Sequence, residues 1–323
     1  THHLENDGTL TCSGASSITI SGDWDNGALA TFTASTSTVT FDGSSADQNI
    51  TINGDAFYNL VLNNTASSGS DDIILAQELD VDNNITITNG DLDQNTNNVN
   101  ISVGGDWSMG SNGSLDSGSG LETVILDGVN QSLLGSSDFN NLTKIESSDD
   151  TTDAVLTIEA SSVQTIAGTL NFGGLDNDDR LNLVSDNPGT IYTLDVTSGA
   201  QNVSWLDVTD SHASSNDILA TFSVNGGNND DGDTPPTDQW IFASTFYWVG
   251  TAGGNTNDSS SWASSSGSCG TGGAGIPASN DVAVFDSGCT NNATVDATLN
   301  VGGLNIESGY SGTITPNATV DVD

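Results

Sequence analysis

Three short motifs occur twice in this chain, in the same order and about 83 residues apart, which indicates an internal repeat. The first set is residues 21–24 (SGDW), 38–43 (TVTFDG) and 57–60 (FYNL). The second set is residues 104–107 (GGDW), 123–128 (TVILDG) and 139–142 (FNNL). The offset is nearly the same for all three motifs, which leaves room only for small loop insertions between the copies. Such regular repetition is typical of solenoid folds.

Within each copy, β-branched residues alternate with polar residues in short runs. Such runs are residues 18–20 (ITI), 38–41 (TVTF), 49–52 (NITI) and 84–88 (NITIT). The runs end at Gly-containing pairs that accept the positive φ of tight turns, namely Asn53-Gly54, Asn89-Gly90, Asp127-Gly128 and Gly302-Gly303. Strand-like runs recur about every 8–12 residues along the whole sequence, so the fold is predicted to be all-β.

A period of about 83 residues is too long for one coil, so each copy is predicted to contain several coils of about 20–25 residues. About fourteen such coils would account for the chain. Only 34% of the residues are hydrophobic, which raises disorder as the alternative. A β-solenoid resolves this, because every second strand residue points outward and the core between stacked coils is narrow. The sequence therefore predicts a β-solenoid, or parallel β-helix-like repeats.

A domain boundary is expected near residue 243. Residues 225–236 (NGGNNDDGDTPP) have the composition of a loop or linker, and residues 246–250 (FYWVG) begin a new apolar run. We predict a β-solenoid over residues 1–243 and a second β-rich module over residues 244–323. The strand-like alternation of residues 319–323 predicts that this module continues into a neighbouring unit, either in a tandem array or by head-to-tail stacking.

The charge excludes several classes of partner. The chain has 43 acidic residues and only two basic ones, Lys144 and Arg180, for a formal net charge of −41. Nothing neutralises phosphate groups, so we expect no nucleic-acid partner and no anionic membrane surface. No apolar run approaches the roughly 18 residues of a membrane helix, so we expect no membrane insertion.

The repeated blocks resemble repetitive extracellular β-solenoid proteins of bacteria and archaea, such as adhesin-like and surface-layer-like giant proteins. The resemblance rests on the FYNL, GDW and TVTF motifs described above. In addition, residues 200–242 look like the closing segment of such a block and residues 246–286 look like the opening of the next. The resemblance implies extracellular display or assembly at the cell surface and implies no reaction.

Acidic loops are candidate calcium sites, because closely spaced carboxylates supply the hard oxygen ligands that Ca²⁺ prefers. We predict calcium ligands at two loops, comprising Asp176, Asp178 and Asp179, and Asp230, Asp231 and Asp233. Other acidic pairs are Asp71 with Asp72, Asp80 with Asp82 and Asp91 with Asp93. The alternative for all of them is a solvated acidic surface. No EF-hand loop is present in the sequence.

The three cysteines do not form a zinc motif. Cys269 and Cys289 flank the Gly-rich loop of the second module, and a disulfide between them is predicted. Cys12 is left over. It is either buried and inert or bonded across a junction to another unit.

Catalytic motifs are missing from the sequence. His2 and His3 lie at one end, and His212 lies in a Ser-rich turn. Paired carboxylates can hydrolyse glycosides, but Lys144 and Arg180 have no supporting motif for polysaccharide lyase chemistry. Trp24 and Trp107 follow Gly-Asp in both copies, which predicts a structural corner, whereas a glycan-stacking platform is the alternative for the tryptophans.

These observations predict a non-catalytic extracellular protein that assembles head to tail, or forms one unit of a tandem-repeat fibre, sheath or surface layer. Its expected partners are other copies of itself, and its only expected cofactor is Ca²⁺. The alternative is an adhesin stalk or glycan-binding module that contacts cell-surface glycans. A polysaccharide-active β-helix enzyme ranks third.

Overall fold

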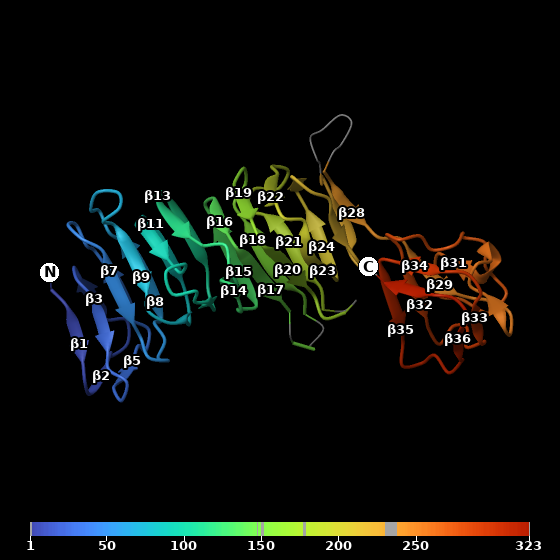
Figure 1. Cartoon of the computed structure of the whole chain (residues 1–323), viewed down its shortest axis with the longest axis horizontal. Helices are drawn as coiled ribbons and strands as arrows, with labels where there is room; N and C mark the ends of the chain where they lie inside the picture. The colour runs from blue at the N-terminus through green and yellow to red at the C-terminus, as the bar shows by residue number, and fades with distance from the viewer. Residues whose placement is uncertain (1, 147, 150–151, 177–178, 230–237, 323) are drawn as a thin grey trace. The chain divides into compact units, whose positions relative to one another are not determined.

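The structure is a computed structural model that describes residues 2–146, 148–149, 152–176, 179–229 and 238–322 (Figure 1). It is all-β, about 1% helical, and its parallel strands stack into about 13 turns of β-solenoid. The predicted fold class is therefore confirmed. None of the helical turns in the described part of the chain has the length and hydropathy of a membrane-spanning helix.

The contacts within the chain divide it into two compact units. The first comprises Thr1–Ile218 and Asn225–Trp240, and the second comprises Leu219–Val224 and Ile241–Asp323. The predicted cut after residue 243 lies beside this division, but the short segment Leu219–Val224 groups with the second unit. Two short strands near the division are β26 (Ile218–Ala220) and β28 (Trp240–Phe242).

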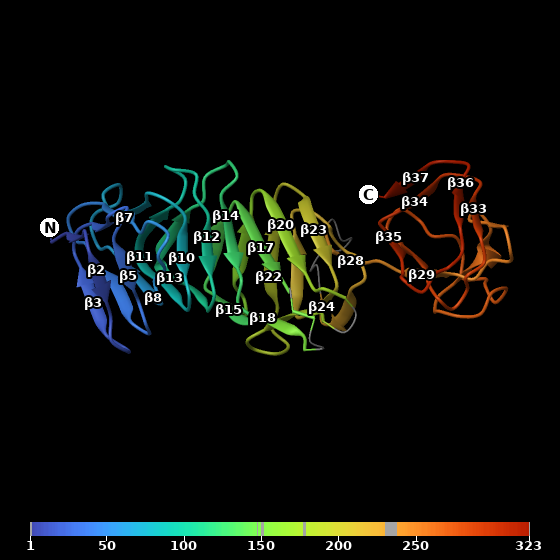
Figure 2. The same cartoon turned by 90° about the horizontal axis from the view of Figure 1, so that it is seen from below.

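Each coil of the first unit crosses three faces in a fixed order (Figure 2). The first face contains β1 (Leu4–Asn6), β4 (Trp24–Asn26), β7 (Gln48–Thr51), β9 (Asp72–Leu75), the last residues of β11 (Ile85–Asp93) and β13 (Trp107–Asp116), then β16 (Ser137–Phe139), β19 (Val163–Ile166), β22 (Tyr192–Val196) and β25 (Ser211–Ser214). The second face contains β2 (Thr9–Thr11), β5 (Thr31–Thr33), β10 (Leu79–Val81), β12 (Ile101–Val103), β14 (Thr123–Leu126), β17 (Asn141–Ile145), β20 (Thr169–Gly173) and β23 (Ala200–Ser204), with Phe57 bridged to Val81.

The third face contains β3 (Ser17–Ile20), β6 (Thr38–Phe41), β8 (Asn59–Asn63), the first residues of β11 and β13, then β15 (Asn130–Leu134), β18 (Ala154–Ile158), β21 (Leu181–Ser185), β24 (Leu206–Thr209) and β27 (Val224–Gly227). Coil length is not constant along the stack. The coil from Leu4 to its register partner Trp24 is short, whereas the coil from Leu170 to its partner Gln201 is longer.

The core of the first unit is a narrow apolar channel filled from all three faces. In β6, Val39 and Phe41 are fully buried, while Thr38 and Thr40, which alternate with them, point outward. The next coil places Leu60 and Leu62 directly beside Val39 and Phe41. Because only alternate residues fill the channel, the low apolar content of the chain is sufficient for a folded core.

Buried glutamines hold equivalent corners of the two copies. The Gln48 side-chain amide donates to the carbonyl oxygens of Ile20 at 3.1 Å and Gly22 at 2.8 Å. In the later copy, the Gln131 amide donates to the carbonyl oxygens of Val103 at 2.8 Å and Gly105 at 2.6 Å. Each donor and acceptor residue of the later corner lies 83 residues after its counterpart in the earlier corner, which is the spacing of the sequence repeat. The sequence repeat is therefore a structural repeat.

One repeat is not a whole number of coils. Trp24 lies on the first face, whereas its equivalent Trp107 lies on the third. From β4 the chain passes β5, β6, β7, the Phe57 bridge, β8, β9, β10, both halves of β11, then β12 and the start of β13. These are eleven strand positions, or three and two-thirds coils of three positions each. Equivalent residues of successive copies therefore move to a different face.

The Gly-containing pairs have two different roles. Asn53 and Gly54 have φ angles of 54° and 82° and form a turn, as predicted. The prediction of a strand end at Asn89-Gly90 was wrong, because β11 continues through both residues to Asp93. The register shifts between Ile87 and Asn89, and Gly90 has a φ of 90°. This strand therefore bends around the corner from the third face to the first without ending.

The corner glutamine makes a testable contribution to stability. Besides its two donated hydrogen bonds, Gln48 accepts the backbone N–H of Gly43 at 2.9 Å. In Gln48→Leu, the buried carbonyl of Gly22 and N–H of Gly43 lose their partner, while the Ile20 carbonyl keeps only the Asp42 N–H, so we expect the free energy of unfolding to fall by about 2–4 kcal/mol. Urea denaturation measures this. Gln77→Leu is the control, since Gln77 makes an exposed bond to Asn53, and a loss equal to that of Gln48→Leu would contradict the corner role.

The second unit is a shorter stack built in the same way. Its parallel ladders are β29 (Thr245–Trp248), β32 (Val282–Phe285) and β35 (Gly303–Ile306); β30 (Gly254–Asn255), β33 (Ala293–Val295) and β36 (Ile314–Pro316); and β34 (Leu299–Val301) with β37 (Val320–Val322). In addition, β31 (Trp262–Ala263) pairs antiparallel with β29. Trp248, Trp262 and Phe285 form the centre of its core, with ring centroids 5.5–5.6 Å apart.

Candidate functional site

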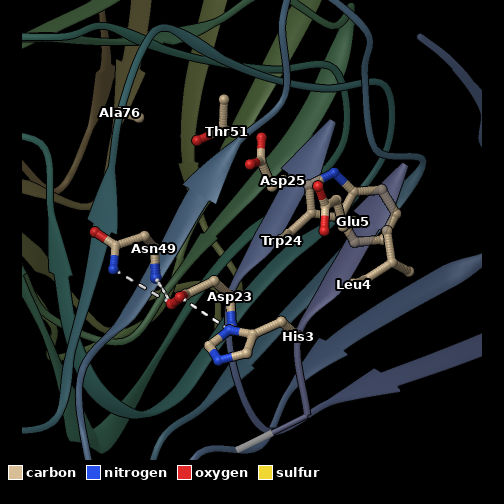
Figure 3. A pocket seen from close by; sticks show the side chains of 9 residues that line it. All are labelled: His3, Leu4, Glu5, Asp23, Trp24, Asp25, Asn49, Thr51 and Ala76. Carbon is tan, nitrogen blue, oxygen red and sulfur yellow. Dashed lines mark hydrogen bonds and ion pairs between the residues drawn. The ribbon is translucent and has the colours of Figure 1, made fainter. Parts of the chain in front are cut away.

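A groove with a volume of about 550 Å³ lies on the first face, near the first coils (Figure 3). It is lined by His3, Leu4, Glu5, Asp23, Trp24, Asp25, Asn49, Thr51 and Ala76. Three of these side chains are carboxylates, one is an imidazole and the indole is fully buried beneath them. The groove therefore contains groups that could act in acid–base chemistry or bind a polar ligand.

The hydrogen bonds of Asp23 indicate a structural role instead. Its Oδ1 accepts the backbone N–H of Asn49 at 2.8 Å, and its Oδ2 lies 3.0 Å from Nδ1 of His3 (Figure 3). In the later copy, Oδ1 of Asp106 accepts the backbone N–H of Ser132 at 2.7 Å. Asp106 and Ser132 are the repeat equivalents of Asp23 and Asn49. The contact between Asp23 and Asn49 therefore recurs in the later copy, outside this groove, as a contact that joins neighbouring coils.

A second groove, of about 410 Å³, lies on the second face and includes Asp55, Glu78 and Asp80. Oδ2 of Asp55 accepts the Asn26 amide at 2.8 Å and the backbone N–H of Phe32 at 2.7 Å, so it too joins neighbouring coils. Burial, followed by repulsion from nearby carboxylates, raises the pKa of Asp80. This groove concentrates negative charge, and its lining residues contain no nucleophile paired with a base.

The predicted calcium ligands are only partly visible. Asp178, Asp230, Asp231 and Asp233 lie outside the described residues. Asp179 is buried, and its Oδ1 accepts the backbone N–H of Thr152 at 3.0 Å. Asp176 lies near the Arg180 guanidinium and raises its pKa, against a larger lowering by burial. The described residues contain no group of three or more His, Cys, Asp or Glu side chains that could hold a metal ion. Calcium binding stays a prediction.

Carboxylates line up along the first face. Asp72 is the direct partner of Asp91 in the next coil, and its backbone N–H donates to Oδ1 of Asp47 in the preceding coil at 3.2 Å. Burial and then repulsion by Asp47 and Asp91 raise the pKa of Asp72. We refer to Asp47, Asp72 and Asp91 as the acidic row. It concentrates charge at the spacing of neighbouring coils, about 4.8 Å.

The cysteines are joined as the sequence suggests. A disulfide links Cys269 to Cys289, across the Gly-rich loop of the second unit. Cys12 is a buried free thiol in the structure. Because Cys289 is almost fully buried, the disulfide fixes an otherwise exposed loop to the core.

The tryptophans serve mainly as core residues. Trp24, Trp107, Trp248 and Trp262 are fully buried, which removes them as sugar-stacking surfaces. Of the other two, Trp205 lies 5.6 Å from the Arg180 guanidinium, and the Trp240 indole N–H donates to Oγ of Ser211 at 3.0 Å. A glycan platform made of tryptophans therefore has little accessible surface.

One of the two basic residues is a buried lysine, which the sequence-based expectations did not include. Lys144 points into the first unit, only 1% exposed, and occupies the position that Leu62 has in the earlier copy. Its Nζ donates to the carbonyl oxygen of Gly128, to that of Val129 at 3.2 Å and to Oε1 of Gln131 at 2.7 Å. Burial lowers the pKa of Lys144 to about 8. The repeat held a signal for this inward position, because aligning residues 57–62 with 139–144 places Lys144 opposite Leu62.

We expect Lys144→Met to destabilise the chain by about 2–3 kcal/mol at pH 7, because one buried and two partly buried oxygen acceptors lose their donor. Since the folded pKa lies below the unfolded one, the native state binds fewer protons between about pH 8 and 10.5. The wild type should therefore gain stability over that window, and the variant should not. Urea denaturation at pH 7, 8 and 10 tests this. Ile145→Met, at a 44% exposed neighbour, should change stability by less than about 0.5 kcal/mol.

No family model, curated protein or solved structure matches this chain significantly, so its function has to be inferred from its own fold and residues.

Proposed function

We propose that this chain is a non-catalytic structural protein of the cell exterior whose coils stack end to end, in a fibre, sheath or surface layer. The proposal rests on the ends of the two coil stacks, where each of the outermost described strands is hydrogen-bonded to a neighbouring strand on one side only. In the first unit β1, β2 and β3 pair only with β4, β5 and β6, and in the second β35, β36 and β37 pair only with β32, β33 and β34. Such edges are templates for β-augmentation.

The last coil also exposes apolar side chains that continue the core. Val320 and Val322 are the register partners of Leu299 and Val301, which are buried. Val320 is nevertheless 36% exposed and Val322 50% exposed, as is Ile306 at 54%. A further coil, supplied by a second copy or by more of the same chain, would bury these side chains and pair the edge strands.

The other parts of the proposal have indirect support. The Cys269–Cys289 disulfide favours an oxidising compartment outside the cytosol. Asp23 and Asp55, one carboxylate from the lining of each groove, are used for contacts between coils, which favours a structural role over catalysis. The adhesin or glycan-binding alternative is less supported, because four of the six tryptophans are fully buried.

Sedimentation velocity over a range of concentrations tests the stacking. We expect elongated oligomers of the wild-type chain, with frictional ratios that rise as they grow. Val320→Asp with Val322→Asp places charge on the apolar end, so oligomerisation should weaken at least tenfold. Leu121→Asp with Val163→Asp adds the same charge at other exposed positions and should have no such effect. A wild-type chain that remains a monomer, or two double variants that behave alike, would contradict head-to-tail stacking.

A further inference from the structure

The glutamine corner of the later copy differs from that of the earlier copy by a buried amine. In the earlier copy, Oε1 of Gln48 accepts the backbone N–H of Gly43 at 2.9 Å, and Leu62 is a core residue. In the later copy, Oε1 of Gln131 lies 2.7 Å from Nζ of Lys144, which takes the place of Leu62. A nucleophile, the primary amine, therefore meets an electrophile, the primary carboxamide, in the later copy and not in the earlier one.

The carboxamide of Gln131 is held in place and shielded from water. Its Nε2 donates to the carbonyl oxygens of Val103 at 2.8 Å and Gly105 at 2.6 Å. Gln131 is 3% exposed and Lys144 is 1% exposed, so water, the competing nucleophile, has little access. Because a carbonyl carbon lies about 1.2 Å from its oxygen, Cδ of Gln131 is within about 3.9 Å of Nζ. A shift of about half an ångström brings the two atoms to the distance of a near-attack arrangement, about 3–3.5 Å.

Two backbone carbonyl groups orient the amine. Besides its bond to Gln131, Nζ of Lys144 donates to the carbonyl oxygens of Gly128 and Val129. An ammonium group has three protons, and each of these three acceptors can take one. When the proton directed at Gln131 is lost, the other two remain in the bonds to Gly128 and Val129. The lone pair of the neutral amine then points at the carboxamide, which is the orientation that nucleophilic attack needs.

We propose that Nζ of Lys144 attacks Cδ of Gln131 and forms an isopeptide bond inside the first unit, so that the chain modifies itself. The Nζ–Cδ bond forms and the Cδ–Nε2 bond breaks. One proton of the neutral amine passes to Nε2, which leaves as ammonia. The step needs no oxidant, reductant or second substrate. The hydrogen-bonded ammonium group of Lys144 is the state of the chain before this step.

The isopeptide bond would join two faces of the solenoid across the core. Gln131 belongs to β15 on the third face and Lys144 to β17 on the second face, and β16 lies between them in the chain. The bond therefore closes a ring that contains one strand from each of the three faces. Like a disulfide, such a link restricts the unfolded chain and raises the thermal midpoint. The inference rests on the geometry of this corner and does not depend on end-to-end stacking.

Intact-mass spectrometry of the purified chain detects the step as the loss of one molecule of ammonia during incubation at pH 7, 8 and 9. A protease that cleaves after acidic residues should then release residues 128–138 and 139–146 as one joined peptide. The peptide that contains Gln48 should stay unlinked, because no amine faces that side chain in the earlier copy.

The pH dependence of the rate identifies the attacking amine. Burial lowers the pKa of Lys144 to about 8, against smaller rises caused by Glu146 and Asp127. Since only the neutral amine attacks, a pKa near 8 predicts that the rate rises about fivefold from pH 7 to pH 8 and less than about twofold from pH 8 to pH 9. A rate that rises tenfold over each of these steps would assign the loss of ammonia to hydroxide-driven chemistry elsewhere and would overturn the inference.

Two variants and an unfolded control complete the test. Lys144→Met and Gln131→Met each remove one reacting group and should keep the full mass. The wild type in concentrated urea should keep it as well, because the unfolded chain does not hold the two groups together, and this comparison needs neither variant to fold. An unchanged wild-type mass after incubation at pH 9, or an equal loss of ammonia from the wild type and Lys144→Met, would overturn the inference. Either result would leave end-to-end stacking, which sedimentation measures, unaffected.

Discussion

Replacing Trp107 by alanine is expected to lower the free energy of unfolding by about 3–5 kcal/mol, the range for deleting a fully buried aromatic side chain. The Trp107 ring fills the channel beside Phe139, with centroids 5.6 Å apart, and its indole N–H donates to Oγ of Ser137 at 3.0 Å. Its neighbours belong to the next coil, so the cavity would weaken the stack on both sides. Thermal and urea denaturation of the purified chain measure the loss.

Two further variants separate packing from hydrogen bonding at this position. Trp107→Phe retains most of the ring volume and loses the bond to Ser137, so we expect a smaller loss of about 1–2 kcal/mol. Trp24→Ala should cost nearly as much through packing alone, because Trp24 packs against Phe32 and Phe57 and its buried indole N–H makes no hydrogen bond within the described part of the chain. If Trp107→Ala left stability unchanged and removed binding to a glycan, the core role of the repeated tryptophan would be wrong.

The second large effect is an increase in stability as the pH falls from 7 towards the ordinary pKa of a carboxyl group, about 4. Burial and neighbouring carboxylates raise the pKa of several acidic groups, namely Asp72, Asp80, Asp91, Asp207 and Glu307. A raised folded pKa means that the native state binds more protons than the unfolded state between the two pKa values. The free energy of unfolding therefore rises as the pH falls through that window. The repulsion among 41 net charges acts in the same direction.

Thermal midpoints at pH 5, 6 and 7 in low salt test this prediction, and Asp72→Asn should flatten the profile because it removes the middle charge of the acidic row. Asp258→Asn is a control of opposite sign, since the backbone N–H and hydroxyl of Ser260 lower the pKa of Asp258. A thermal midpoint that falls steadily from pH 7 to pH 5 would contradict the expected repulsion.

Salt distinguishes general repulsion from calcium sites. Sodium chloride at about 0.5 M should raise the thermal midpoint at pH 7, because it screens exposed charges over more than a few ångströms. If calcium at matched ionic strength gives the same rise, screening accounts for it. A further rise with calcium, reversed by a chelator, would support the predicted sites around Asp176 and Asp179.

The fold class could be predicted from sequence because its cause is local. Alternation such as that at Thr38–Phe41 sets which side chains enter the core, and Asn53-Gly54 marks a turn by backbone conformation alone. The face of the solenoid on which equivalent residues of the two copies lie could not be predicted. Trp24 and Trp107 show that the copies exist, but the number of strands between them depends on which Gly pairs end a strand, and Asn89-Gly90 does not.

The candidate sites were less predictable, because they depend on register between coils. Asp23 and Asp106 are similar in sequence, yet their use as corner acceptors appears only when the next coil is placed beside them. The acidic row likewise consists of residues that are distant in sequence and become neighbours only through the register of the coils.

Distances between spin labels along the third face test the stacked-coil account most directly. In a Cys12→Ser background, one label replaces Ser17 and the second replaces either Ser132, five coils away, or Thr209, eight coils away. At about 4.8 Å for each coil, the backbone separations are expected near 24 Å and 38 Å, so the second pair should be longer by about 14 Å. Equal distances for the two pairs, or a Ser17–Thr209 separation below about 25 Å, would contradict a stack of coils.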